Sequence, residues 1–157
     1  MEKKLVISYN EYNSMEELPI EDRLLMQHAL SATETSYSPY SHFRVGAAVR
    51  LSDGSIVEGS NQENLAYPSG LCAERTAMFA ASVRNPQAAF EALAIVGRNK
   101  EGTLTEAAPC GACRQVMAEY EQRHGVKMRI LTYLDGGKIR CFDGVGSLLP
   151  FIFAAEL

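Results

Sequence analysis

Three stretches of the chain repeat their hydrophobic residues at the three- and four-residue spacing of an amphipathic helix. This spacing predicts helices over about residues 20–36, 72–84 and 110–124. A proline precedes the first stretch, an Asn-Pro pair follows the second, and Gly125 follows the third. These residues are typical of helix boundaries, so the sequence predicts both the existence of the helices and their approximate ends.

The segments between the helices are short and apolar, and some of them alternate apolar and polar residues. The stretch "RVGAAVRL" alternates, "SDGS" predicts a turn, and the apolar pattern returns at Ile56. A compact apolar stretch, "FEALAIVG", follows the second helix. After the third helix, "KMRILTYL" and "KIRCF" flank a Gly-Gly turn. The sequence therefore predicts five strands, arranged as a hairpin, a single strand and a second hairpin.

The order of these elements indicates the class of fold. A helix between two apolar strands predicts a βαβ crossover with parallel pairing, whereas the hairpins add antiparallel pairs. We expect a three-layer α/β/α fold of the α/β class, with a mixed sheet of about five strands and helices on both faces. The length of 157 residues suits one domain, predicted over residues 19–157 after an N-terminal extension, residues 1–18.

Composition and charge exclude some classes of partner. The net charge is -4 and the chain has no basic run, which argues against a long nucleic-acid duplex as the partner. The apolar run Leu5–Ile7 is too short for a signal peptide or a membrane span. We therefore expect a cytoplasmic protein, without nucleic-acid or membrane partners, whose four cysteines remain thiols.

Three of these cysteines indicate a metal site. Cys72, Cys110 and Cys113 each fall at or near a predicted helix N-terminus, where backbone N–H groups and the helix dipole favour a thiolate. Three thiolates that converge from two helix ends are soft ligands in a roughly tetrahedral arrangement, and Zn²⁺ is the metal that such ligands favour. The fourth cysteine, Cys141, lies on a predicted strand, so we expect an open coordination position that water could occupy.

The residues next to Cys72 suggest how such a water would react. Zinc lowers the pKa of a bound water to about 7, and the carboxylate of Glu74, two residues from a ligand, can accept the water's proton. Three thiolates leave the centre with a net negative charge, which weakens the metal as a Lewis acid. We hypothesise that Arg75 donates a hydrogen bond to a ligand sulfur and so withdraws part of that charge.

Four motifs, in order, resemble a known family. They are "SPYSHFRVGAA", "NQENLAYPSGLCAERTA", "PCGACRQVM" and "LLP". Together they are similar to the small homotetrameric, zinc-dependent cytidine deaminases, over about residues 20–153. A "CAE" followed by "PCGAC" is also the general signature of zinc deaminases. The resemblance is specific because the motifs occur in order, at suitable spacing, with the acidic residue in place.

The resemblance implies an activity and a set of site residues. The activity is hydrolytic deamination of cytidine and deoxycytidine to uridine and deoxyuridine, with release of ammonia, in pyrimidine salvage. Glu74 would be the catalytic proton carrier, and the cysteines would hold one Zn²⁺ per chain. The residues implied in substrate binding are Asn61 and Glu63 at the ribose 3'-hydroxyl, Phe43 near the base, Tyr67 near the sugar's 5' end, the main chain of Ala73 at the pyrimidine, and Phe153 in a neighbouring subunit's site.

Other interpretations predict different observations. Blasticidin S deaminases share a "CAE" site, but the "NQEN" stretch favours a ribose over that antibiotic. A deaminase of polynucleotides would need a basic groove, which this acidic chain does not supply. A zinc-stabilised interaction protein without catalysis would close its metal site with a fourth ligand, and its function would survive loss of Glu74.

Overall fold

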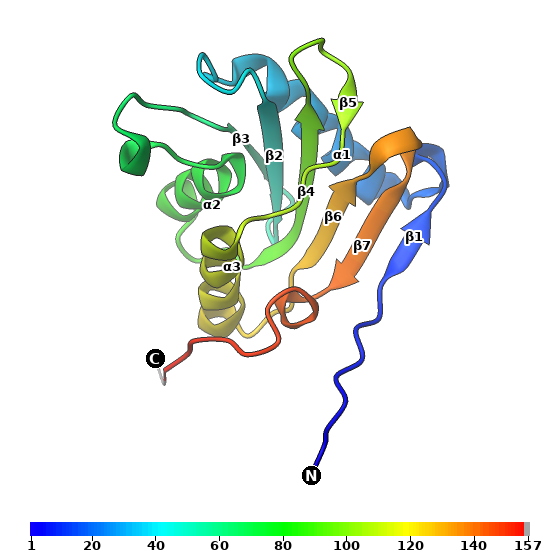
Figure 1. The fold of residues 1–157 in the computed structure, drawn as a ribbon. Helices are drawn as coiled ribbons and strands as arrows, with labels where there is room; N and C mark the ends of the chain where they lie inside the picture. Colours follow the sequence, from blue (N-terminus) through cyan, green and yellow to red (C-terminus); the bar gives the residue numbers. More distant parts are fainter. Residues whose placement is uncertain (156–157) are drawn as a thin grey trace.

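The computed structural model describes residues 1–155 and consists of one mixed sheet between two helical layers (Figure 1). The helices in the described part of the chain are α1 (Ile20–Ala32), α2 (Ala73–Arg84) and α3 (Gly111–His124). The strands are β1 (Asn10–Tyr12), β2 (Arg44–Leu51), β3 (Ile56–Ser60), β4 (Phe90–Arg98), β5 (Leu104–Thr105), β6 (Arg129–Tyr133) and β7 (Ile139–Asp143). Short 3₁₀ turns cover Met15–Glu17, Thr33–Thr35, Tyr67–Ser69, Asp135–Gly137 and Val145–Ser147.

The sheet has the mixed topology that the sequence predicts. The strand order is β1-β7-β6-β4-β2-β3, with β5 paired to β4 outside this path. Strands β4 and β6 are parallel and are joined through α3, which confirms the βαβ crossover. The hairpins β2–β3 and β6–β7 are antiparallel, as expected.

The described residues form seven strands rather than about five. The two additional strands, β1 and β5, are three and two residues long. Strands this short cannot display the alternation from which strands are recognised, because at least about four residues are needed. Strand β1 lies in the segment expected as an N-terminal extension, and it pairs with β7. Leu18 from the same segment is buried.

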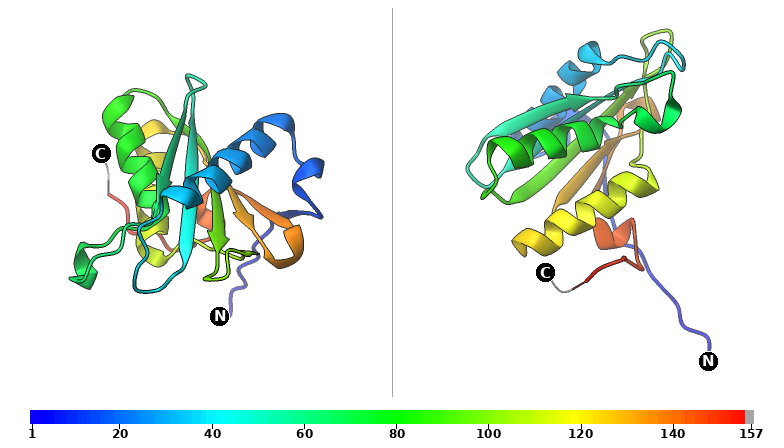
Figure 2. Two further views of the ribbon diagram at one scale, coloured as in Figure 1. Left: turned by 90° about the horizontal axis from the view of Figure 1, so that it is seen from above. Right: turned by 90° about the vertical axis from the view of Figure 1, so that its left-hand side faces the viewer.

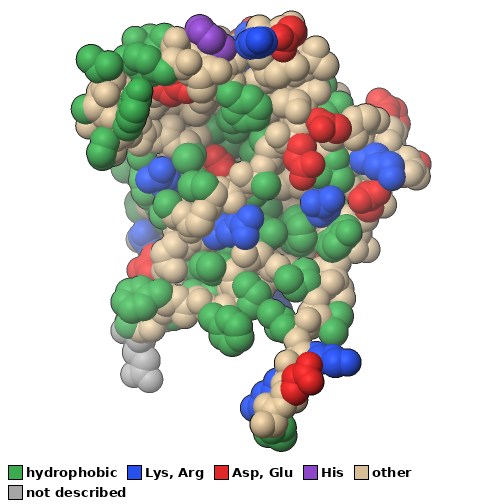
Figure 3. Space-filling model, viewed as in Figure 1, with side chains coloured by type: hydrophobic (Ala, Val, Ile, Leu, Met, Phe, Trp, Pro, Cys, Tyr) green, Lys and Arg blue, Asp and Glu red, His purple; other side chains and the backbone are tan. Residues whose placement is uncertain are grey.

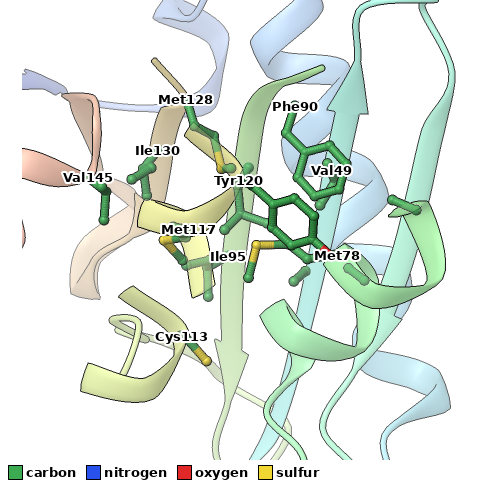
Figure 4. Packing of buried hydrophobic residues seen from close by; sticks show 14 of the residues in the cluster. Val49, Met78, Phe90, Ile95, Cys113, Met117, Tyr120, Met128, Ile130 and Val145 are labelled. Atoms are coloured by element: carbon green, nitrogen blue, oxygen red, sulfur yellow. The ribbon is translucent and has the colours of Figure 1, made fainter. Parts of the chain in front are cut away.

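The helices cover both faces of the sheet (Figure 2). Helix α1 lies on one face and buries Leu25, Met26 and Ala29 against apolar residues of β2, β4, β6 and β7. Helices α2 and α3 lie on the other face and bury a larger cluster, in which the ring centroids of Phe90 and Tyr120 are 4.2 Å apart (Figure 4).

Two glycines allow the helices to approach the sheet closely. A Cβ atom on Gly46 of β2 would lie 2.0 Å from the carbonyl oxygen of Ala29 in α1. A Cβ atom on Gly59 of β3 would lie 2.4 Å from the backbone nitrogen of Ala77 in α2. Because α2 begins one residue after Cys72, the contact at Gly59 also determines where that cysteine lies.

Candidate metal centre and pocket

The three predicted ligands come together at the N-terminal ends of α2 and α3. Cys72 is the residue that precedes the first turn of α2, and Cys110 has the same place in α3. Cys113 follows one turn later and is fully buried. Both helices therefore direct the positive ends of their dipoles at one group of sulfur atoms.

The distances between the sulfur atoms fit a tetrahedral metal site. The Sγ atoms of the three cysteines all lie within 4.8 Å of one another. Those of Cys72 and Cys110 are 3.7 Å apart, and those of Cys110 and Cys113 are 3.5 Å apart. A tetrahedral zinc with Zn–S bonds of about 2.3 Å requires sulfur atoms about 3.8 Å apart. The donor set and its spacing therefore suit Zn²⁺.

The fourth cysteine does not belong to this group. Cys141 is buried in the core cluster under α1, whereas Cys113 is buried in the cluster under α2 and α3. Cys141 thus lies on the other side of the sheet from the three sulfur atoms. Cys141 therefore cannot be the fourth ligand that a closed metal site would need.

The environment of Cys72 stabilises its thiolate. Hydrogen bonds from the Cys113 thiol and from Arg75 lower the pKa of Cys72 to about 5. The pKa of Cys113 is raised because its thiol is held by the hydrogen bond to Cys72 and is buried. The Nη2 atom of Arg75 lies 3.6 Å from the Cys72 Sγ, so the guanidinium makes the contact with a ligand sulfur that the hypothesis about Arg75 requires.

Glu74 is buried beside this group of sulfur atoms. It lies in the first turn of α2 and is 4% exposed. Burial raises the pKa of its carboxyl group to about 7, because the charged form loses its hydration. A carboxyl group with this pKa can both accept and release a proton near neutral pH, as a general acid–base catalyst must.

A pocket of about 840 Å³ opens onto the metal centre. Its lining brings together most of the residues that the sequence singled out, which come from three separate stretches of the chain. They are Phe43, Asn61, Glu63, Tyr67, Cys72, Ala73, Glu74, Arg75 and Cys110. A cavity of this size, lined by both apolar and polar residues, has the general character of a small-molecule site.

Asn61 and Glu63 are held in place by hydrogen bonds within the protein. The Oδ1 atom of Asn61 accepts from Ser36 Oγ and from the Val45 backbone N–H, and its Nδ2 donates to the Phe43 carbonyl. Glu63 accepts from the backbone N–H groups of residues 40 and 41 and from the Ser41 hydroxyl. One N–H of the Asn61 amide makes none of these bonds and could reach a ligand.

Among the residues predicted to bind substrate, Phe153 does not line this pocket. It is 85% exposed, its carbonyl oxygen accepts a hydrogen bond from Gln115 Nε2 of α3, and it is absent from the described lining of the pocket. Glu106, which no motif of the sequence singles out, also belongs to that lining. Its position four residues before Cys110 was the available signal, because the segment that leads to a ligand must border the site.

Comparisons with known proteins agree with this geometry. Residues 19–128 match the family model described as the cytidine and deoxycytidylate deaminase zinc-binding region. A cytidine deaminase of Sporosarcina psychrophila is 44% identical over 132 residues, which cover 84% of this chain and 90% of that protein. One from Halalkalibacterium halodurans is 45% identical over 97 residues, 62% of this chain and 70% of that protein.

Solved structures show the same fold. The crystal structure of a cytidine deaminase from Burkholderia pseudomallei matches with a TM-score of 0.71 at 40% identity, over 83% of this chain and 97% of that one. That of a cytidine deaminase from Mycobacterium tuberculosis matches with a TM-score of 0.68 at 32% identity, over 87% of this chain and all of that one. The chain therefore belongs to the cytidine and deoxycytidylate deaminase family and is a hydrolytic deaminase.

Proposed function

We propose that this protein deaminates cytidine and deoxycytidine to uridine and deoxyuridine, with release of ammonia, as a step of pyrimidine salvage. The observation that carries the proposal is the buried carboxyl group of Glu74 beside three convergent cysteine sulfur atoms at one end of a pocket. One Zn²⁺ per chain, held by Cys72, Cys110 and Cys113, would supply a Lewis acid that lowers the pKa of the attacking water.

Glu74 carries the proton in this proposal. Its carboxylate accepts a proton from the attacking water and delivers it to N3 of the pyrimidine as the water oxygen bonds to C4. It then carries the second proton of that oxygen to the leaving amine, as the C4–N bond breaks, ammonia leaves and the C4=O bond of the product forms. Both transfers need a group that exchanges protons near neutral pH, which the pKa of about 7 supports. Arg75 binds the Cys72 sulfur and limits the negative charge of the centre, which keeps the metal effective as a Lewis acid.

The rest of the pocket would hold the nucleoside. Phe43 and the main chain of Ala73 contact the base, Tyr67 lies at the 5' end of the sugar, and Asn61 and Glu63 bind the ribose hydroxyl. Each of these residues is part of the pocket lining, which supports these roles. The hydrogen bonds that fix Asn61 and Glu63 mean that the substrate meets groups already in position, which reduces the entropy lost on binding.

The charges of the pocket favour a nucleoside over a nucleotide. Among the described residues of the lining, Glu63, Glu74 and Glu106 are acidic and Arg75 alone is cationic. Because the Arg75 guanidinium contacts the Cys72 sulfur, it is not free to bind a phosphate. A 5'-phosphate would therefore enter a pocket of its own sign, which disfavours deoxycytidylate as the substrate.

The proposal includes a homotetramer in the cytoplasm, with Phe153 completing the site of a neighbouring subunit. The exposed position of Phe153, away from the pocket of its own chain, is compatible with that role. None of the helices in residues 1–155 is long and apolar enough to cross a membrane.

Ammonia release by zinc-loaded protein tests the proposal. Cytidine, deoxycytidine, cytosine, deoxycytidylate and blasticidin S are offered in parallel, and a Glu74→Ala variant of equal zinc content is the control. We expect turnover of the two nucleosides alone and its loss in the variant. Equal turnover by wild type and variant, or turnover of deoxycytidylate or blasticidin S in place of the nucleosides, would contradict the proposal.

A further inference from the structure

The N-terminal segment contacts the face of the sheet on which the pocket lies. Strand β1 pairs with β7, with Glu11 opposite Arg140. The ring of Tyr9, just before β1, lies 5.6 Å from that of Phe142, a residue buried in the core cluster under α2 and α3. Because residues two apart in a strand share a face, Tyr9, Arg140 and Phe142 all lie on the α3 side of the sheet.

Arg140 lies between this segment and the pocket. Its guanidinium carbon is 5.1 Å from the centre of the Tyr9 ring, a distance typical of a cation–π contact. Its Nη1 atom is 3.7 Å from Oε1 of Glu106, which belongs to the pocket lining. Glu11 is also close to Arg140, but its carboxylate is 2.8 Å from Lys138 Nζ, so Lys138 is its main partner.

The wall that carries Glu106 is anchored on the same hairpin. The Oδ1 atom of Asp135, in the turn between β6 and β7, accepts from Thr105 Oγ1 and from the Glu106 backbone N–H. The backbone at Glu106 is therefore fixed by the turn, while its side chain is restrained by Arg140. Acidic and basic side chains lie beside one another over β5 and β7 (Figure 3).

We propose that Tyr9 is a positioning residue for the pocket, and that it acts through Arg140 to hold the carboxylate of Glu106 at the pocket wall. The contact gives the N-terminal segment a role in substrate binding rather than in catalysis. Glu74 and the cysteines are carried by α2 and α3, so the chemical step does not depend on Tyr9. The inference rests on the proposed function, since it concerns the binding of the same nucleoside.

The test compares variants of Tyr9 in the zinc-loaded, full-length protein. Tyr9→Leu removes the aromatic ring, whereas Tyr9→Phe keeps it. Val6→Ala, on the exposed part of the same segment, is the matched control. We expect Tyr9→Leu to raise KM for cytidine about two- to five-fold, the factor to which an exposed cation–π contact corresponds. The expected kcat is unchanged, and Tyr9→Phe and Val6→Ala should behave as wild type.

A double-mutant cycle with Glu106→Gln tests whether the effect passes through Glu106. We expect Tyr9→Leu to change KM little once the Glu106 charge is gone, because coupled residues are not additive. A second readout does not depend on activity: the ¹³C resonance of the Glu106 carboxyl group, assigned with Glu106→Gln, should shift in Tyr9→Leu but not in Val6→Ala, because only Tyr9 contacts the Arg140 guanidinium that faces this carboxylate. Zinc content and melting temperature show whether each variant is folded.

The outcomes separate this inference from the proposed function. If wild type deaminates cytidine but Tyr9→Leu matches Val6→Ala in KM and in the Glu106 carboxyl resonance, the positioning role is wrong. An additive effect of Tyr9→Leu and Glu106→Gln would also overturn it, because Glu106 would then not transmit the effect. If wild type does not turn over cytidine, the proposed function fails, and the Glu106 carboxyl resonance still decides whether Tyr9 holds this carboxylate through Arg140.

Discussion

Glu74 combines burial, a raised pKa and a position next to a metal ligand. Replacing it with Gln keeps the size and polarity of the side chain but removes proton transfer. We expect Glu74→Gln to lower kcat by about 10²- to 10⁴-fold, the usual contribution of a general acid–base group, and to leave the zinc content at the wild-type level. Steady-state kinetics and metal analysis of the same samples would check this. A variant with more than a tenth of wild-type kcat would show that another group moves the proton.

Arg75 is the second residue whose change has a specific consequence. The contact between Arg75 Nη2 and Cys72 Sγ predicts that Arg75→Gln weakens the metal site, because the thiolate loses a cationic partner. Changes of residues that hydrogen-bond to a metal ligand typically cost about 10- to 100-fold in affinity or activity. Competition with a chromophoric chelator would measure zinc affinity, alongside kcat. Wild-type values for both would make Arg75 an ordinary surface cation.

At the scale of single residues, the sequence predicts the chemistry better than the hydrogen bonding. The ligands and Glu74 are predictable because metal coordination demands particular side chains at particular spacings. The internal bonds of Asn61 depend on Phe43 and Val45, which become its neighbours only when β2 and β3 pair, and on Ser36, which follows the 3₁₀ turn after α1. The position of Glu106 likewise depends on Asp135 and Arg140, which lie in the turn and in β7 of the β6–β7 hairpin.

Among the elements, α2 is the one whose position most directly determines the site. The contact between Gly59 and Ala77 predicts that Gly59→Ala pushes α2 away from the sheet and moves Cys72 relative to Cys110. We expect a loss of about 3 kcal/mol in the free energy of unfolding, at the upper end for overpacked cores, together with weaker zinc binding. Chemical denaturation of the zinc-loaded protein would measure the loss.

A matched glycine provides the control for this change. A Cβ atom on Gly146 would meet no atom within 4 Å, and Gly146 does not have a positive φ. Gly146→Ala should therefore leave both stability and zinc affinity close to wild type. If the two alanine variants were equally stable, the close approach at Gly59 would not be what positions α2.

The sequence predicts the helices and longer strands because each shows a period of its own. Helix α3 ends where expected, since Gly125 has a φ of 67°, a conformation that favours glycine. Strands β1 and β5 have no such signal. Strand β1 pairs with the side of β7 that β6 leaves open, and β5 pairs with Gly97 and Arg98, at the end of β4 that extends beyond its pairing with β6. Both opportunities are properties of the assembled sheet and not of the short segments themselves.

For the whole molecule, the proposed sharing of sites between subunits has a direct test. Tetramers made only of Glu74→Gln subunits, or only of Phe153→Ala subunits, are each expected to assemble but to have reduced activity. If a site takes Glu74 from one subunit and Phe153 from another, random mixing restores both residues in roughly a quarter of the sites, since each partner is correct in about half of the cases. Activity after subunit exchange at a 1:1 ratio would check this.

As a control for the mixing experiment, each variant alone is taken through the same subunit-exchange procedure. No gain of activity in the mixed sample, with exchange shown by mass spectrometry, would mean that Phe153 does not serve a neighbour's site.

The arrangement of subunits is a property that neither periodicity nor spacing can predict, because it depends on the shape of surfaces that the fold creates. The three-layer arrangement of a single chain could be predicted, because each helix must bury its apolar face and the apolar strands form the sheet against which it packs.

The separation of the metal ligands along the chain has a consequence for folding kinetics. Cys72 and Cys110 lie on either side of β4 in the sequence, and their sulfur atoms reach 3.7 Å only when α2 and α3 are both seated on the sheet. We expect a metal that needs both helices in place to bind after the main folding barrier has been crossed. Zinc should therefore leave the rate of folding almost unchanged and slow the rate of unfolding, so that it acts mainly by prolonging the lifetime of the folded enzyme.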